Sequence, residues 1–351
     1  MSQAVNVKSL SRGMFGLAPI LFTATIFLSA SLLFFVQPLF TKIVLPAIGG
    51  APAVWTTAML FFQTVLIAGY LYAHLSTKYL SVTAQLRLHL MLWAVALLFL
   101  PLSIQTGWRF DPDSPVAYQT LILFALGVGM PFAVLSANAP LIQSWYAKSD
   151  GPSADDPYFL YGASNLGSLS ALLAFPLVAE PLFDASQIGW GWTAGFVALG
   201  GFLALSGLAA RNGRTVPTAQ SYSDKPTVKD FCWWIVLAFI PSSLMLALTS
   251  KISTDIGSFP LVWVLPLALY LLTFVLSFSN RLLIRGETLD SAFLLSVAIF
   301  AMMLTGMKLS HVTIPLTIML LLAFFFIAMK AHKALYDARP GHNSLTIFYV
   351  T

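Results

Sequence analysis

The chain has 351 residues, of which 58% are hydrophobic and 9% are charged, and its formal net charge is +5. Soluble domains average about 25% charged residues, and a water-soluble fold of this length could not bury so much apolar surface. The composition therefore excludes an ordinary soluble protein and indicates that lipid surrounds most of the chain. The basic residues are scattered rather than gathered in one patch, so nucleic acid is not an expected partner.

Long stretches without a charged residue follow one another along the chain and predict its membrane spans. A spanning helix needs roughly 20 residues, with a range of about 17–25, and an isolated strand could not satisfy its backbone in hydrocarbon. We therefore predict an all-α, polytopic membrane helical bundle with about ten transmembrane helices. The ten stretches are 13–41, 43–77, 88–108, 114–147, 157–179, 185–210, 231–250, 256–280, 291–307 and 309–329.

Lysine and arginine residues fall mostly on one side of the membrane when these spans alternate from a cytoplasmic N-terminus. Of the 18 basic residues, 14 then lie in cytoplasmic segments. The opposite side holds only Lys42, Arg109, Lys251 and Lys308. An excess of Lys and Arg in cytoplasmic loops is the rule for membrane proteins. The sequence therefore predicts a cytoplasmic N-terminus.

The longest polar segment, 211–230, divides the chain after the sixth predicted helix. We expect a first six-helix bundle at 1–210, a cytoplasmic linker at 211–230 and a second bundle at 231–351. Ser29-Ala30-Ser31-Leu32-Leu33 and Pro241-Ser242-Ser243-Leu244-Met245 occupy matching places in the two halves, and each is followed by an outer lysine. Two interpretations stay open: a parallel, major-facilitator-like 6+6 repeat, and chance similarity between apolar helices.

The last residues, 344–351, resemble the first turns of an eleventh helix. At 1.5 Å per residue, eight residues cannot cross a bilayer. We therefore expect the second bundle to be incomplete, with the chain stopping inside an element.

Several segments resemble one bacterial family, the membrane-embedded N-terminal region of fused, spermidine-synthase-like proteins, which is often described as major-facilitator-like. The matching segments are Phe34-Phe35-Val36-Gln37-Pro38-Leu39, Leu45-Pro46, Gly49-Gly50, Pro52-Ala53-Val54-Trp55-Thr56-Thr57-Ala58-Met59-Leu60-Phe61-Phe62-Gln63, Gly69-Tyr70, Asn138-Ala139-Pro140-Leu141, Asp156-Pro157-Tyr158-Phe159-Leu160-Tyr161, Ser164-Asn165-Leu166-Gly167-Ser168 and Trp263-Val264-Leu265-Pro266-Leu267-Ala268-Leu269-Tyr270-Leu271-Leu272-Thr273-Phe274.

This resemblance implies a location in the bacterial inner membrane and a link to polyamines. In the family, a soluble aminopropyltransferase-like domain usually follows the membrane region, and we expect no such domain within these 351 residues. Synthase activity is therefore not carried over. The resemblance leaves two functions open. One is a transporter-like protein for a small polar or cationic substrate. The other is a membrane anchor or scaffold for a cytoplasmic aminopropyltransferase-like domain or partner.

The first candidate site is the outer corner after the first predicted helix, where Gln37, Pro38, Lys42 and Pro46 interrupt an apolar run. Proline breaks helix geometry, so we expect a broken or re-entrant segment, and broken segments at matching places mark transporter sites. The matching place in the second half holds Lys251 and Asp255, four residues apart and able to pair on one helical turn. The alternative is an ordinary outer loop, with helix-breaking residues and with charges at the membrane interface.

Polar residues inside the predicted spans are the other pathway candidates: Gln63, Asn138, Asn165, Ser168, Ser242 and Ser243. Asn165 and Ser168 lie beside a stripe of small residues, Ala163, Gly167 and Ala171, which equally predicts tight helix packing. The run Gly127–Pro131 should kink the fourth predicted helix, and Asn138-Ala139-Pro140 should end it. The alternative for Gln63 is a side chain hydrogen-bonded between helices.

No catalytic constellation can be assembled from the sequence, which argues against an enzyme. The histidines have no metal-ligand spacing, so we expect neither a metal nor a cofactor. His332 lies at the end of the tenth predicted span, where we expect it to be solvated. No carboxylate lies at the centre of a predicted span, which weakens the case for a cation substrate, because buried charge usually marks such sites.

Overall fold

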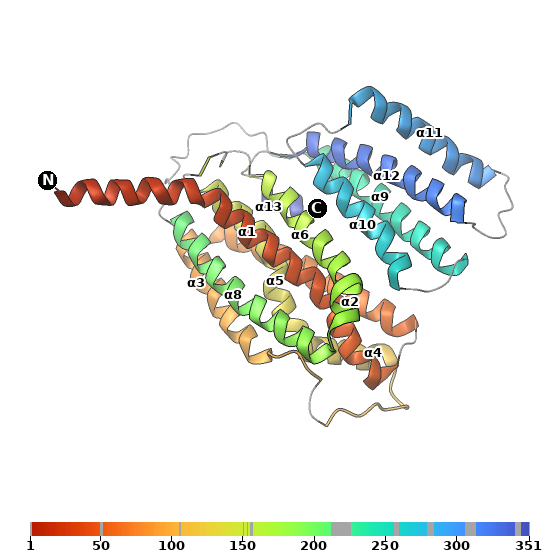
Figure 1. Cartoon of the computed structure of the whole chain (residues 1–351), viewed down its shortest axis with the longest axis horizontal. Coiled ribbons are helices and arrows are strands. Elements are labelled where there is room, and N and C mark those ends of the chain that lie inside the picture. Colours follow the sequence, from red (N-terminus) through yellow and green to blue (C-terminus); the bar gives the residue numbers. More distant parts are fainter. Residues whose placement is uncertain are drawn as a thin grey trace.

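The computed structural model describes residues 2–49, 52–104, 107–149, 151–152, 154, 157–211, 226–255, 260–278, 284–305, 314–340 and 345–350. The described residues form helices and their connections, with no strand among them. This confirms the predicted all-α class. The helices are arranged as two bundles that lie side by side, as Figure 1 shows.

The first bundle is built from the helices that precede residue 212. The bounds are α1 Ser2–Ile48, α2 Pro52–Tyr79, α3 Val82–Ala96 with a 3₁₀ turn Leu97–Phe99, α4 Val116–Phe124, α5 Met130–Ala147, α6 Phe159–Ala174, α7 Glu180–Leu182 and α8 Ala185–Arg211. Helix α1 lies at the centre, packed against α5, α6 and α8. Its N-terminal part extends away from the bundle (Figure 1).

In the part of the chain that the structure describes, four helices form the second bundle. They are α9 Val228–Asp255, α10 Pro260–Ser277, α11 Gly286–Thr305 and α12 Ile314–Asp337. Helix α12 is central and packs on α9, α10 and α11. The short helix α13, Leu345–Val350, packs against α2 and α5 of the first bundle. A side-chain contact links it to α2, because Thr346 Oγ1 lies 3.0 Å from His74 Nδ1.

Eight helical segments of the described chain are long and apolar enough to cross a membrane. They correspond to the first seven predicted stretches and the tenth. Helices α10 and α11 occupy the two stretches between them. Large apolar side chains are exposed on the outside, for example Leu60, Ile67, Leu98, Phe239 and Leu294. Water would oppose this exposure and lipid does not, so the fold is that of a multi-pass membrane protein.

Helix α1 corrects the prediction of a broken outer corner. It runs without interruption through Pro38 and Pro46 to Ile48, with Gly49 at a positive φ of 79° after its end. Side chains bond to the backbone on both sides of Pro38: Gln37 Nε2 donates to Leu33 O at 3.3 Å, and Thr41 Oγ1 to Gln37 O at 2.7 Å. Proline is tolerated in spanning helices because such local bonds and neighbouring helices compensate for the lost donor.

The fourth predicted span is irregular where the glycines predict it. A π-helical turn, Ala125–Gly129, separates α4 from α5. A Cβ atom at Gly127 would lie 2.2 Å from Cζ of Phe40, so the close approach of α1 requires glycine. The predicted end at Asn138-Ala139-Pro140 is wrong, because α5 continues through Pro140 to Ala147.

Helices α6 and α10 form the main contact between the two bundles. One part of this contact is apolar, with Leu172 of α6 against Val264, Ala268 and Leu271 of α10. The other part is aromatic and gathers side chains of both bundles around Phe274 and Phe278. We call this second part the seam. It comprises the rings of Tyr158, Tyr161, Trp234, Phe274 and Phe278, with the polar groups of Tyr70, Ser242, Tyr270, Thr273 and His332 beside them.

Candidate functional site

The seam is lined by aromatic rings from both bundles. Tyr161 of α6 contacts the rings of Phe274 of α10 and of Phe278, just after α10, with centroid distances of 5.4 and 4.4 Å. Trp234 of α9 and Tyr158, just before α6, belong to the same buried cluster. Aromatic pairs at such distances stabilise a contact beyond the area that they bury. The seam is therefore a specific contact between the bundles.

Hydroxyl groups of four helices border these rings. Tyr70 of α2, Tyr161 of α6 and Tyr270 of α10 lie close enough to interact electrostatically. Ser242 Oγ of α9 donates to Ala238 O at 2.7 Å and lies 3.1 Å from the Tyr270 hydroxyl. Because the single proton of Ser242 is directed to Ala238, the Tyr270 hydroxyl is the donor to Ser242.

His332 of α12 is a fully enclosed polar group at the seam, with no exposed surface. Its ring is stacked on Phe274 at 3.6 Å between centroids, and the Tyr270 ring meets it edge-on at 4.8 Å. The prediction that His332 is solvated is therefore wrong. Residues of α10 cover the ring, and the sequence position near the end of α12 does not reveal that cover.

The hydrogen bonds of His332 fix its tautomer. Nδ1 lies 2.8 Å from Thr273 Oγ1, and that hydroxyl donates its proton to Tyr270 O at 2.7 Å. Nδ1 must therefore carry the proton and donate to Thr273, which leaves Nε2 as an acceptor in the neutral ring. Nε2 is buried without a hydrogen-bond partner. His332 Nε2 is therefore a buried hydrogen-bond acceptor at the seam that can bind a donor group.

One end of the seam already holds a cation. The guanidinium of Arg339 lies 3.7 Å from the ring centroid of Tyr336 and 5.3 Å from that of Tyr158. The segment after α12 is fastened there by two bonds: the Tyr158 hydroxyl donates to Pro340 O, and Trp234 Nε1 donates to Ala338 O, both at 2.8 Å. The tyrosine faces of the seam are thus placed to attract positive charge.

A second polar centre lies inside the first bundle. His89 Nε2 of α3 lies 2.8 Å from Asn138 Oδ1 of α5, and Asn138 Nδ2 donates to Ser29 Oγ of α1 at 2.8 Å. All three residues are buried. The Nδ1 atom of His89 has no partner, and neither do the nearby Tyr72 hydroxyl and Trp93 Nε1. The predicted pathway residue Asn138 therefore links three helices within the bundle.

Two of the other predicted residues border the seam, and most of the rest do not. Asn165 Nδ2 donates to Tyr161 O at 2.9 Å, and Ser242 contacts Tyr270. Ser168 is buried and donates to Ser164 O within α6, whereas Gln63 of α2 is exposed.

The charged and outer candidates lie elsewhere. Lys42 Nζ is 3.2 Å from Glu180 Oε1, which joins α1 to α7. Gln37 bonds within α1. Ser243 and Lys251 line a pocket of the second bundle. The side chain of Asp255 lies outside the described residues, so the predicted pair with Lys251 is not placed.

The small-residue stripe of α6 serves helix packing. A Cβ atom at Gly167 would lie 2.4 Å from Phe27 O, and Ser31 Oγ of α1 donates to Gly167 O at 3.1 Å. The backbones of α1 and α6 can approach this closely because the crossing residue is glycine.

Sequence reasoning missed the main groups of the seam: Tyr70, Tyr161, Tyr270, Thr273 and His332. The sequence did contain a signal for three of them. Tyr70, Tyr161 and Tyr270 lie within predicted spans, whereas tyrosine in membrane proteins is enriched at the two membrane interfaces. Among the described residues, no three His, Cys, Asp or Glu side chains are grouped to hold a metal ion. Comparison with protein-family models, curated proteins and solved structures gives no match to this chain.

Proposed function

We propose that this multi-pass membrane protein is transporter-like and that the seam is its solute pathway. The observation that carries the proposal is the composition of the seam. Hydroxyl groups and aromatic faces of α2 and α6 meet those of α9, α10 and α12 where the two bundles touch. Substrate sites of many transporters lie at the interface between two such halves.

The proposed solute is a small organic cation. Aromatic faces attract cations, and Arg339 already occupies two of them at the end of the seam. The acceptor Nε2 of His332 and the Tyr270 hydroxyl supply hydrogen-bonding groups beside the rings. A short polyamine combines positive charge with N–H donors and an apolar stem. This is the solute class that the resemblance to spermidine-synthase-like proteins implies.

Uptake into proteoliposomes tests the proposal. The purified chain is reconstituted and offered radiolabelled spermidine, a quaternary ammonium ion and a neutral sugar in parallel. We expect uptake of the cations above that of protein-free liposomes and no uptake of the sugar. Equal rates for all three solutes, or rates equal to the protein-free background, would contradict the proposal.

Variants at Tyr161 locate the site. Tyr161→Leu removes the aromatic face, and because one cation–π contact is worth about 0.5–2 kcal/mol, uptake should fall about 2- to 30-fold. Tyr161→Phe keeps the face and should retain most of the activity. The matched control is Tyr118→Leu on α4, where the tyrosine is 61% exposed and distant in sequence from the seam. A loss that is equal at both positions would remove the seam from the mechanism.

A further inference from the structure

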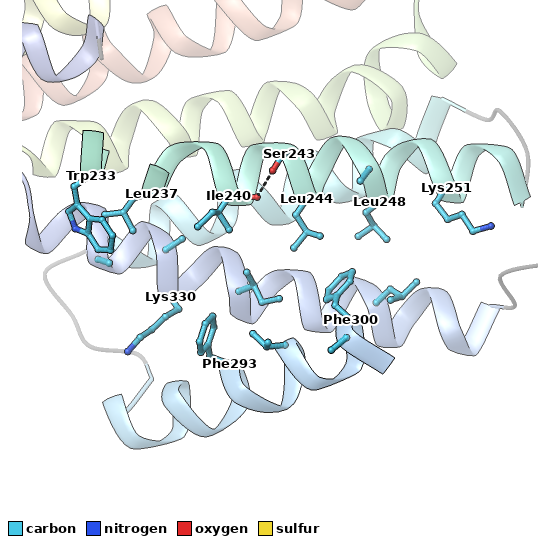
Figure 2. A pocket seen from close by; sticks show the side chains of 17 residues that line it. Trp233, Leu237, Ile240, Ser243, Leu244, Leu248, Lys251, Phe293, Phe300 and Lys330 are labelled. Carbon is cyan, nitrogen blue, oxygen red and sulfur yellow. Dashed lines mark hydrogen bonds between the residues drawn. The ribbon is translucent and has the colours of Figure 1, made fainter. Parts of the chain in front are cut away.

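The second bundle contains a long pocket that the seam residues Tyr70, Tyr161 and Tyr270 do not line. Its volume is about 1090 Å³, and its walls are α9 and α11, with α12 as the floor (Figure 2). Helices α9 and α11 each pack on α12. Figure 2 shows Leu244 and Leu248 directed from α9 into the space that Phe293 and Phe300 enter from α11.

The length of the pocket along α9 is close to the thickness of the hydrocarbon core of a membrane. On α9 its lining extends from Trp233 to Lys251. This separation corresponds to roughly 27 Å of helix at 1.5 Å per residue, and the hydrocarbon core of a bilayer is about 30 Å thick. An occupant that lies along the helices would therefore run parallel to the lipid chains.

The chemistry of the lining excludes a polar solute. Among the described lining residues, neutral polar groups are confined to the indole of Trp233 at one end and to Ser243, whose hydroxyl donates to Ile240 O at 3.1 Å within α9. A sugar or a polyamine placed here would lose its hydrogen bonds to water without replacing them, which costs free energy. Apolar chains, in contrast, meet leucine, alanine and phenylalanine side chains along nearly the whole pocket.

A lysine residue lies at each end of the pocket. Lys251 lies at one end and Lys330 at the other, and no carboxylate is among the residues that line it. The Lys330 ammonium pairs with Asp290 of α11, so that end carries a matched ion pair. Basic groups at the edge of a gap between spanning helices attract anionic headgroups. Apolar walls with an ammonium group at the mouth therefore match an anionic lipid.

We propose that this pocket binds a phospholipid with an anionic headgroup. The headgroup lies at Lys251, and an acyl chain lies between α9 and α11 against Leu248 and Leu244. Half of the hydrocarbon core is about 15 Å, which corresponds to roughly ten residues of α9 at 1.5 Å each. The part of the pocket between Lys251 and Ile240 is thus long enough for one acyl chain. This site is separate from the solute pathway and does not depend on it.

Native mass spectrometry of the full chain in detergent tests the site. The protein is mixed with equal amounts of phosphatidylglycerol and phosphatidylcholine, and the lipids that remain bound are counted. We expect one phosphatidylglycerol to be retained in preference to phosphatidylcholine. Lys251→Gln should reduce that preference about two- to fivefold, as expected for one exposed charge pair. Lys229→Gln, at the other end of α9 and outside the pocket, should not reduce it.

A second pair of variants tests the location of the acyl chain. Ala247→Phe fills the pocket, whereas Leu246→Phe changes a neighbour that is exposed but does not line it. We expect Ala247→Phe to lower retention of phosphatidylglycerol at least tenfold and Leu246→Phe to leave it unchanged. Val297→Phe fills the pocket from α11 and serves as the second test if Ala247→Phe does not fold.

Three results would overturn the proposal. The first is equal retention of phosphatidylglycerol by the filled and control variants, which would mean unspecific lipid only. The second is equal retention of the two lipids by the unaltered protein. The third is a purified dimer that Ala247→Phe converts to a monomer without a change in bound lipid, which would assign the pocket to a second copy of the chain.

Discussion

His89 Nε2 lies 2.8 Å from Oδ1 of Asn138, and this bond joins α3 to α5 inside the first bundle. Asn138 also donates to Ser29 Oγ, so that one amide connects three helices. An amide oxygen only accepts, so His89 Nε2 carries the proton and Nδ1 keeps its lone pair. Hydrogen bonds between spanning helices average about 0.6 kcal/mol and reach about 1.7 kcal/mol. The cluster therefore favours one arrangement of the three helices.

Asn138→Leu should destabilise the first bundle. The change leaves His89 Nε2 and Ser29 Oγ buried without their partner, and each orphaned polar group costs about 1–3 kcal/mol. We expect a clear fall in the midpoint of unfolding, measured by thermal unfolding in detergent with tryptophan fluorescence. The double variant His89→Phe/Asn138→Leu should lose less than the sum of the two single losses, because the residues share one bond. Strict additivity would show that the bond contributes nothing.

Gly167→Ala should disrupt the crossing of α1 and α6. The added Cβ would lie 2.4 Å from Phe27 O, and a backbone atom cannot move aside as a flexible side chain can. Forcing extra volume into a packed contact costs about 1–3 kcal/mol. The matched control is Gly201→Ala on α8, where nothing lies within 4 Å of the added Cβ. That variant should be neutral or stabilising by up to about 1 kcal/mol. Equal unfolding midpoints for both variants would argue against a close crossing.

Thiol labelling tests the predicted orientation of the chain. Cys232 is the only cysteine and its side chain is exposed, so Cys232→Ser provides a background without a reactive thiol. In that background, Asp113→Cys lies in a connection that the charge distribution places outside, and Lys78→Cys lies in one that it places inside. A membrane-impermeant maleimide should label the first variant in intact cells and the second only after permeabilisation. The reverse pattern would place the N-terminus outside.

The spans could be predicted because they depend on composition over long windows. An apolar stretch of about 20 residues is long enough to cross a membrane, and this property can be read from the stretch alone. The helices α1–α6 and α8–α12 therefore overlap the charge-free stretches. The glycines of the fourth stretch were also informative, because a π-helical turn lies at Ala125–Gly129.

The local features that were predicted wrongly depend on neighbouring helices. Pro38, Pro46 and Pro140 indicate breaks in an isolated helix, yet α1 and α5 continue through them. The position of His332 near the end of α12 indicates solvent, yet Phe274 and Tyr270 of α10 enclose the ring. In both cases the deciding contacts come from residues distant in sequence, and the periodicity of a single helix does not report them.

Cross-linking α6 to α10 should arrest transport if the two bundles move against each other at the seam. A Cβ atom at Gly162 would lie 3.7 Å from Phe278 O, so a cysteine there comes close to a residue of the second bundle. In the Cys232→Ser background, the pair Gly162→Cys/Phe278→Cys can be bridged by a short bifunctional thiol reagent. We expect cation uptake to be lost on bridging, because a covalent link between the halves prevents their relative rotation.

A link within one bundle is the control for this experiment. A Cβ atom at Gly207 of α8 would lie 2.4 Å from Cδ1 of Leu86 of α3, so Gly207→Cys/Leu86→Cys places two thiols inside the first bundle without that clash. Bridging this pair should leave uptake unchanged, because α3 and α8 belong to the same bundle. Loss of uptake in both pairs would point to damage by the reagent. Full uptake after bridging Gly162→Cys/Phe278→Cys would show that the solute crosses without movement at the seam.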